Sequence, residues 1–375
     1  GQTPAAFGYV PYSRVSDPSR PREIGGYKDI SADWEDLYIY GHYAYLTFSD
    51  GGLRIIDISD PSHPKKTHFI CTSGGPNEVF VSGQYAYLAN NDFNILDISD
   101  PSRPFVVGSL IPADVDGKDA RAVNVSGDYA YVNGVTPHAL RVLDVRDRSN
   151  PREVGTYSAP LGGTLSKGLF VSGNQAYLLG FYTGLHILDV TDPIKPVKAG
   201  CFEAPGPVDL FVSGDYAYLI YADWIDRPDH FGGLRILEIT DPSNPVQVGS
   251  ACIKDDCHGI FIFRGFAYVA GGHCLHVIDI HDPVYPKEVA KFEGEGVFRD
   301  VYVSGEYAYI AAAPSGLTIL DIRDPFTPKE VAKLPRIEAT GIFVRCEYTY
   351  VLDTYFGLTI IRNPNRPFQT LSLAS

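Results

Sequence analysis

The chain has 375 residues, of which 45% are hydrophobic and 20% are charged, and its formal net charge is -14. This acidic excess argues against nucleic-acid binding, because a phosphate-binding face needs a basic excess. No apolar run reaches the roughly 18 residues that a membrane-spanning helix needs, so we expect no membrane span.

The N-terminus and the cysteines bear on location. The chain begins at Gly1 without an initiator Met, as expected of a mature protein after signal removal or of a trimmed chain. Its 6 cysteines are compatible with a few disulfides in an oxidising compartment. We therefore expect an extracellular or cell-surface location.

The first residues do not follow the pattern of the rest of the chain. Residues 1–13 contain proline and glycine without periodicity, so we expect an N-terminal arm there. Residues 17–27, DPSRPREIGGY, then contain a turn signal followed by one strand-like segment.

A unit of four strand-like runs occupies the rest of the chain. In residues 77–110 the runs are rich in Val, Ile, Tyr and Phe and are separated by Ser-Gly, Asn-Asn-Asp and Asp-Pro turns. Copies spaced by 41 to 50 residues begin near Glu35, Asn77, Arg121, Lys167, Val208, His258, Arg299 and Thr340. This period predicts an all-β, eight-bladed β-propeller of four-stranded antiparallel blades, one domain over residues 14–375.

The last unit supplies only three strands, within residues 342–361. The segment at 17–27 supplies the missing fourth, so we expect the N-terminal strand to complete the last blade and close the ring without exposed edges. The alternative uses residues 368–373 as that strand.

An acidic turn follows the third strand of most units. It carries an Asp three residues ahead of an Asp-Pro pair, as in Asp57 with Asp60. An Asp in such a turn accepts backbone N–H bonds, so we interpret these carboxylates as turn formers and not as acid/base groups.

One sequence pattern connects the chain to a known family. Gly-x-Tyr-Ala-Tyr at 41–45 is followed by Leu-x-Ile-x-Asp-Ile at 53–58 and Asp-Pro at 60–61, and variants recur in every unit. This pattern resembles the LVIVD-repeat β-propellers of bacterial and archaeal secreted or surface proteins. The resemblance begins at Asp17 and implies a propeller fold and a secreted or surface location. It implies no catalytic residues, since that family has no single activity.

Function is expected where the repeats differ. The Ser-Gly and Asp-Pro turns are nearly uniform, and in a meander they emerge on one face of the ring. The loops between second and third strands, and those between blades, are diverse and emerge on the opposite face. We place the functional surface on that variable-loop face.

The eight residues that begin the units border the central channel, and they include Arg121, Lys167, Arg299 and His258. Such cations would attract an anionic ligand, for example a carboxylated or sulfated sugar, with Glu35 and Asn77 completing the ring. The alternative is that the cations pair with the adjoining acids Asp36, Glu78, Asp209 and Asp300.

The sixth unit departs most from the repeat. Cys252, Asp255, Asp256 and Cys257 lead into its first strand, and His273, Cys274 and His276 open its third. Cys274 replaces the glycine found there in Gly52, Gly184, Gly233, Gly316 and Gly357. Cys257, His273, Cys274 and His276 are candidate zinc or copper ligands. A Cys257–Cys274 disulfide is the simpler explanation, because no standard zinc spacing is present.

Two further segments carry candidate residues. The insertion at 221–233 contains Trp224, Arg227 and His230, a candidate lid or sugar-stacking platform over the channel, or an ornamental loop. The acidic residues 114–119 could bind calcium, although a solvated turn explains them as well.

Two functions follow from these features. The first is a secreted or surface scaffold without catalysis that binds an anionic small molecule, a glycan or another surface protein. The second is a lyase or hydrolase in which the channel cations neutralise an anionic substrate, such as a uronic acid, and His258 or His230 acts as general acid or base. We expect no cofactor for either function; the candidate ions are calcium and zinc, with copper as a second metal for the cysteine and histidine ligands.

Overall fold

The computed structural model describes residues 22–28, 34–48, 51–72, 74–90, 92–111, 120–134, 139–159, 164–180, 182–204, 206–221, 232–335, 337–353 and 357–362, with only the backbone at 164–167. Every regular element in these ranges is a β-strand. Among them there is no helix that could cross a membrane.

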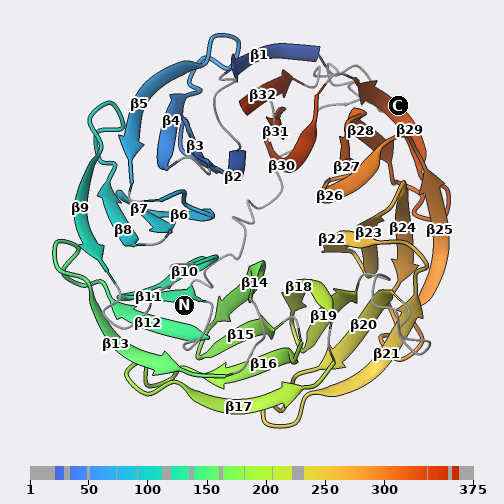
Figure 1. Ribbon diagram of the computed structural model, residues 1–375. Helices are drawn as coiled ribbons and strands as arrows, with labels where there is room; N and C mark the ends of the chain where they lie inside the picture. The colour runs from blue at the N-terminus through green and yellow to red at the C-terminus, as the bar shows by residue number, and fades with distance from the viewer. Residues whose placement is uncertain are drawn as a thin grey trace, which may run out of the picture.

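The strands form eight separate four-stranded sheets arranged as blades around a central axis (Figure 1). Blade 1 contains β2 (Trp34–Tyr40), β3 (Tyr43–Phe48), β4 (Gly52–Asp57) and β5 (Lys65–Cys71). Blade 2 contains β6 (Glu78–Ser82), β7 (Tyr85–Ala89), β8 (Phe93–Asp97) and β9 (Phe105–Leu110). Blade 3 contains β10 (Val123–Ser126), β11 (Tyr129–Asn133), β12 (Leu140–Asp144) and β13 (Arg152–Tyr157). Blade 4 contains β14 (Thr164–Ser172), β15 (Gln175–Gly180), β16 (Gly184–Asp189) and β17 (Val197–Phe202).

The second half of the ring repeats this plan. Blade 5 contains β18 (Pro207–Ser213), β19 (Tyr216–Tyr221), β20 (Gly233–Glu238) and β21 (Val246–Cys252). Blade 6 contains β22 (Cys257–Phe263), β23 (Phe266–Gly271), β24 (Cys274–Asp279) and β25 (Lys287–Glu293). Blade 7 contains β26 (Val297–Ser304), β27 (Tyr307–Ala313), β28 (Gly316–Asp321) and β29 (Lys329–Leu334). Blade 8 contains β30 (Ala339–Arg345), β31 (Tyr348–Asp353), β32 (Gly357–Arg362) and β1 (Arg22–Lys28).

Blade 8 is built from both ends of the described chain. The N-terminal strand β1 pairs antiparallel with β32, with Tyr27 opposite Leu358. Figure 1 shows β1 on the outer rim beside β32. The predicted closure by the N-terminal strand is confirmed, while residues 1–13 and 368–373 lie outside the described part of the chain.

The core consists of eight apolar clusters, each lying between two neighbouring blades. In one of them, Tyr45 and Ile55 of blade 1 pack with Leu88 of blade 2. The residue between the two rings of each Tyr-Ala-Tyr run is fully buried, as Ala44 and Ala86 are. A small side chain there lets adjacent sheets approach while the flanking tyrosines fill the space between them.

The acidic turns shape the repeating face. The Asp57 carboxylate accepts the Ser59 N–H at 2.8 Å, and Asp60 accepts the Ser62 N–H at 3.0 Å. The same bonds recur in the other units and keep the pKa of Asp100, for example, below its usual range. These carboxylates are turn formers, as interpreted from the sequence.

Candidate functional site

Six of the eight residues that begin the units lie on the innermost strands, while Asn77 and Arg121 precede theirs, and in five blades the residue coincides with a β-bulge. The register of the first strand pair skips one position at Glu35, Val208, His258, Arg299 and Thr340. A bulge bends its strand and redirects a side chain. Glu35, Arg299 and Thr340 are exposed, and His258 is half-buried.

The acids beside this ring tie the blades together. Asp36 on β2 accepts the Val79 N–H of the next blade at 3.1 Å. Glu78 on β6 accepts the Val123 N–H at 3.0 Å. Asp209 of blade 5 bonds the Ile260 N–H of blade 6 at 3.3 Å. These three carboxylates therefore serve the scaffold as links between adjacent inner strands.

The predicted anion-binding ring is only partly visible. The Asn77 amide donates to the Ala120 carbonyl at 2.9 Å, so it also links two blades. Arg121 is half-buried and already interacts with other residues of the protein. The side chain of Lys167 lies outside the described residues. Anion binding by this ring stays a prediction.

An aromatic collar lines the channel, a feature that sequence reasoning missed. The third residue after each ring position is Tyr38, Phe80, Asn124, Phe170, Phe211, Phe261, Tyr302 or Phe343. Neighbouring rings touch, with centroids 5.1 Å apart for Phe261 and Tyr302 and 6.0 Å for Tyr38 and Phe80. Five members border a cavity of about 70 Å³. Recurrence of an aromatic residue in seven of the eight units was the available signal.

No disulfide joins Cys257 and Cys274, because the cysteines are all reduced. Both lie opposite Gly271 of β23, one on each side of that strand. Adjacent strands are about 4.8 Å apart, so an intervening strand separates the two Cα atoms by roughly 10 Å. A disulfide needs a Cα separation below about 7 Å. The disulfide expected from the sequence is therefore not formed, and the register explains why.

Two of the four candidate metal ligands do come together, with a third residue. The ligand atoms of Asp255, Cys274 and His276 all lie within 4.8 Å of one another. His273 instead bonds the Gly296 carbonyl at 2.6 Å, and the Cys257 thiol contacts the Asp255 carbonyl at 3.5 Å. Both Cys274 and His276 are buried, and Asp255 is partly exposed.

Two charged residues of β25 surround this cluster. The His276 Nδ1 atom is 2.8 Å from Glu288 Oε1. The Lys291 ammonium is 3.2 Å from Asp255 Oδ2. Burial raises the pKa of the Cys274 thiol, while the neighbouring Lys291 acts in the opposite direction. Glu288 was not identified from the sequence. The available signal was the spacing of 12 residues between His276 and Glu288, which the Arg141–Glu153 pair of blade 3 repeats.

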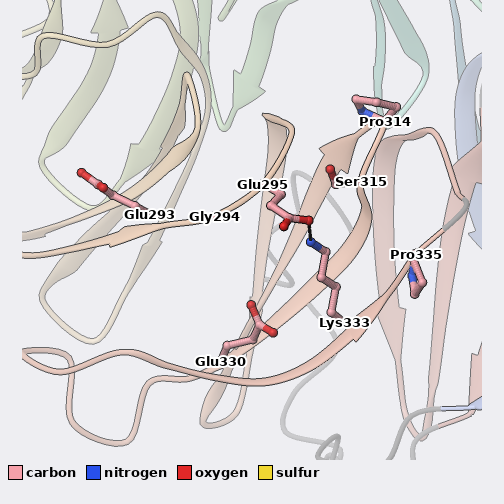
Figure 2. Close-up of a pocket in the computed structure, with 8 residues that line it drawn as sticks. All are labelled: Glu293, Gly294, Glu295, Pro314, Ser315, Glu330, Lys333 and Pro335. Carbon is pink, nitrogen blue, oxygen red and sulfur yellow. Dashed lines mark hydrogen bonds and ion pairs between the residues drawn. The ribbon is translucent and has the colours of Figure 1, made fainter.

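A surface pocket of about 840 Å³ lies beside blade 7 (Figure 2). Its lining residues are Glu293, Gly294, Glu295, Pro314, Ser315, Glu330, Lys333 and Pro335. They come from the end of β25 and its connection to β26, from the β27–β28 loop, and from β29 and the residue that follows it. In Figure 2 the Lys333 ammonium reaches Glu295, and this contact lowers the pKa of Glu295. With three glutamates and one lysine, the pocket is acidic.

Several candidates cannot be placed. Trp224, Arg227 and His230 of the blade 5 insertion lie outside the described residues, as do the acidic residues 114–119. Their predicted roles in ligand binding, catalysis and calcium binding stay predictions.

Solved structures share this architecture at low sequence identity. Saccharomyces cerevisiae Sqt1 matches with a TM-score of 0.74 and 6% identity, over 94% of this chain and 100% of that one. BamB from Moraxella catarrhalis matches with a TM-score of 0.67 and 11% identity, over 93% of this chain and 100% of that one. Chaetomium thermophilum Sqt1, bound to the N-terminus of ribosomal protein L10, matches with a TM-score of 0.70 and 11% identity. The match covers 91% of this chain and 99% of that one. At these identities the likeness concerns the fold alone.

Sequence comparison gives the family. A search of curated proteins finds no match. The family model described as the LVIVD repeat matches residues 33–69, 73–111, 117–159, 165–203, 208–252, 256–293 and 295–334. These matches cover blades 1 to 7, and blade 8, with its strand from the N-terminal end, lies beyond them. The chain belongs to the LVIVD repeat family.

Proposed function

We propose that this protein is an interaction scaffold that binds a protein partner through its variable-loop face, at the acidic pocket beside blade 7. The observation that carries the proposal is the pocket itself. It is formed by a blade connection and a loop between second and third strands, which belong to the diverse set of loops, together with Glu330 and Lys333 of the outer strand β29.

The charge of the pocket indicates the chemistry of the partner. Glu293, Glu295 and Glu330 are three of the four charged lining residues, and Lys333 is the fourth. An acidic surface attracts lysine- or arginine-rich segments and repels anions. The Sqt1 structure with the L10 N-terminus supports peptide-segment recognition on this architecture. We therefore propose a basic segment of a protein as the ligand.

The other sequence-based proposals concern different parts of the molecule. An anionic glycan or substrate would bind at the channel mouth, near Arg121 and Arg299, and His258 would be the general acid or base of an enzyme there. The secreted or surface location stays a prediction as well.

The test is fluorescence anisotropy with three labelled peptides of equal length, one basic, one neutral and one acidic. We expect binding of the basic peptide, with an affinity that falls as salt rises, because exposed charges are screened. The combined Glu293→Gln, Glu295→Gln and Glu330→Gln variant should weaken binding by about tenfold.

A matched variant separates this pocket from the general acidity of the chain. Asp128→Asn, Asp215→Asn and Glu306→Gln remove the same charge from exposed turns of the repeating face. This control should change affinity by less than about twofold. Equal losses in both variants, or no binding of the basic peptide, would contradict the proposed surface.

A further inference from the structure

We propose that blade 6 contains a metal site, in which Asp255, Cys274 and His276 bind one zinc ion. The three ligand atoms come from two elements that the fold holds together. Asp255 lies in the connection between β21 and β22, and the other two lie on β24. None of the three ligands lines the acidic pocket, and the site does not depend on the proposed partner.

The position of the His276 ring is the first argument. The residue is only 2% exposed, and its Nε2 atom makes no hydrogen bond. Asp255 Oδ2 lies 3.0 Å from Nε2 but off the direction in which that nitrogen bonds. Two oxygen or nitrogen ligands of one zinc ion lie about 3.0 to 3.4 Å apart, with the metal between them. The pair therefore has the spacing of two ligands of one ion.

The second argument is the hydrogen bond on the other side of the ring. Glu288 Oε1 is 2.8 Å from Nδ1. A carboxylate at Nδ1 holds the proton there and leaves Nε2 as the metal-binding atom, the arrangement that usually supports a zinc-bound histidine. The sequence places this carboxylate on β25, directly beside β24.

The third argument is the thiol. Cys274 is 5% exposed and occupies the first position of its strand, where five other blades have glycine. The adjoining turn residue Gly272 has φ +53, and a Cβ there would lie 3.3 Å from Asp255 Oδ1. The turn thus keeps the carboxylate close to the thiol. Sulfur, nitrogen and oxygen ligands together suit zinc among the divalent ions.

The Lys291 ammonium competes with a metal ion for the Asp255 carboxylate. It contacts Asp255 and also interacts with Cys274, so it lies beside two of the groups that would bind a metal. The Lys291 ammonium lies 3.7 Å from Glu293 Oε1. Glu293 therefore offers the lysine a second carboxylate when zinc takes its place beside Asp255. Without this lysine the metal should bind more tightly.

The experiment uses the full chain, reduced and freed of metal with a chelator. Zinc is titrated by calorimetry, and cobalt is titrated as a spectroscopic substitute. We expect one ion per chain and a thiolate-to-cobalt charge-transfer band. Cys274→Ser should remove that band, and Glu288→Gln should weaken zinc binding by about 10- to 100-fold. Lys291→Met should tighten it severalfold, because a competing cation is removed.

Controls address surface binding and folding. Cys252→Ser and His281→Gln alter an exposed thiol and an exposed imidazole and should leave the titration unchanged. Cys274→Gly, which restores the residue of other blades, provides a second thiol-free variant if the serine variant fails to fold. The Glu295→Gln and Glu330→Gln variant of the acidic pocket, which keeps Glu293 beside Lys291, should bind zinc like the wild type.

Three results would overturn the proposal. These are the absence of zinc binding in both the wild type and Lys291→Met, a cobalt spectrum without a thiolate band, and a titration that is unaffected by the loss of Cys274. In each case the cluster would be an ion-pair network of the scaffold.

Discussion

Blades 4 and 6 carry a histidine at the same position of the repeat and place it in opposite surroundings. His186 on β16 lies 3.3 Å from the Tyr157 hydroxyl and 3.0 Å from the Thr183 hydroxyl. His276 on β24 lies between the carboxylates of Glu288 and Asp255. The neighbouring strands account for this difference.

The register identifies the residues that differ. Lys198 opposite Leu188 in blade 4 corresponds to Glu288 opposite Ile278 in blade 6. Burial, followed by the charge of Lys198, lowers the pKa of His186 to about 4, so that imidazole is neutral at neutral pH. One scaffold position can thus be a neutral buried side chain or a candidate metal ligand, depending on the outer strand, the blade connection and the first residue of the third strand.

The largest expected effect concerns how the two blades pack against the next one. Gly200 of blade 4 lies where a Cβ would be 2.3 Å from the Pro242 carbonyl oxygen, whereas blade 6 has Ala290 at this position. Gly200→Val should lower the free energy of unfolding by about 3 kcal/mol through overpacking. Ala290→Gly should cost about 1 kcal/mol or less. Urea unfolding of both variants checks this, and equal losses would contradict it.

A smaller effect should separate the two histidines. In metal-free protein, His276→Leu leaves two carboxylates beside an apolar side chain. It should lower the free energy of unfolding by about 2 to 3 kcal/mol. His186→Leu leaves only hydroxyl groups, and we expect a loss of about 1 kcal/mol. Thermal unfolding with a chelator present measures both. If His186→Leu proved the more damaging, the assignment of the charged surroundings to blade 6 alone would fail.

The smallest effect is the contribution of His186 in blade 4 to the pH dependence of stability. Well above pH 6.5 His186 is neutral in both the folded and the unfolded state, so its titration does not affect the free energy of unfolding. As pH falls from 6.5 toward 4, the unfolded chain takes up a proton that the folded protein excludes, and stability decreases. His186→Gln should remove about 2 kcal/mol of this decrease. Unfolding curves at pH 7 and pH 4.5 provide the measurement, and parallel losses in both proteins would refute it.

The histidine comparison also shows where sequence reasoning stops. Cys274 and His276 are recognisable because they depart from the repeat, and both belong to the cluster in the structure. Asp255 and Glu288 join them across a blade connection and a neighbouring strand, which no local pattern encodes. The expected Cys257–Cys274 disulfide was wrong because β23 lies between the two residues, which the sequence alone did not reveal.

Local and repeated features follow from the chain alone. Strand alternation, Asp-Pro turns and the period near 41 to 50 residues predict eight blades and their closure by residues 17–27, because each depends on neighbouring residues and recurs. The groups that face one another across blades depend on register, bulges and the meeting of distant loops. Only the folded ring brings Asp255 to His276, Asp36 to Val79 and Glu295 to Lys333. Contacts of this kind join residues far apart in sequence, so no short stretch of the chain specifies them.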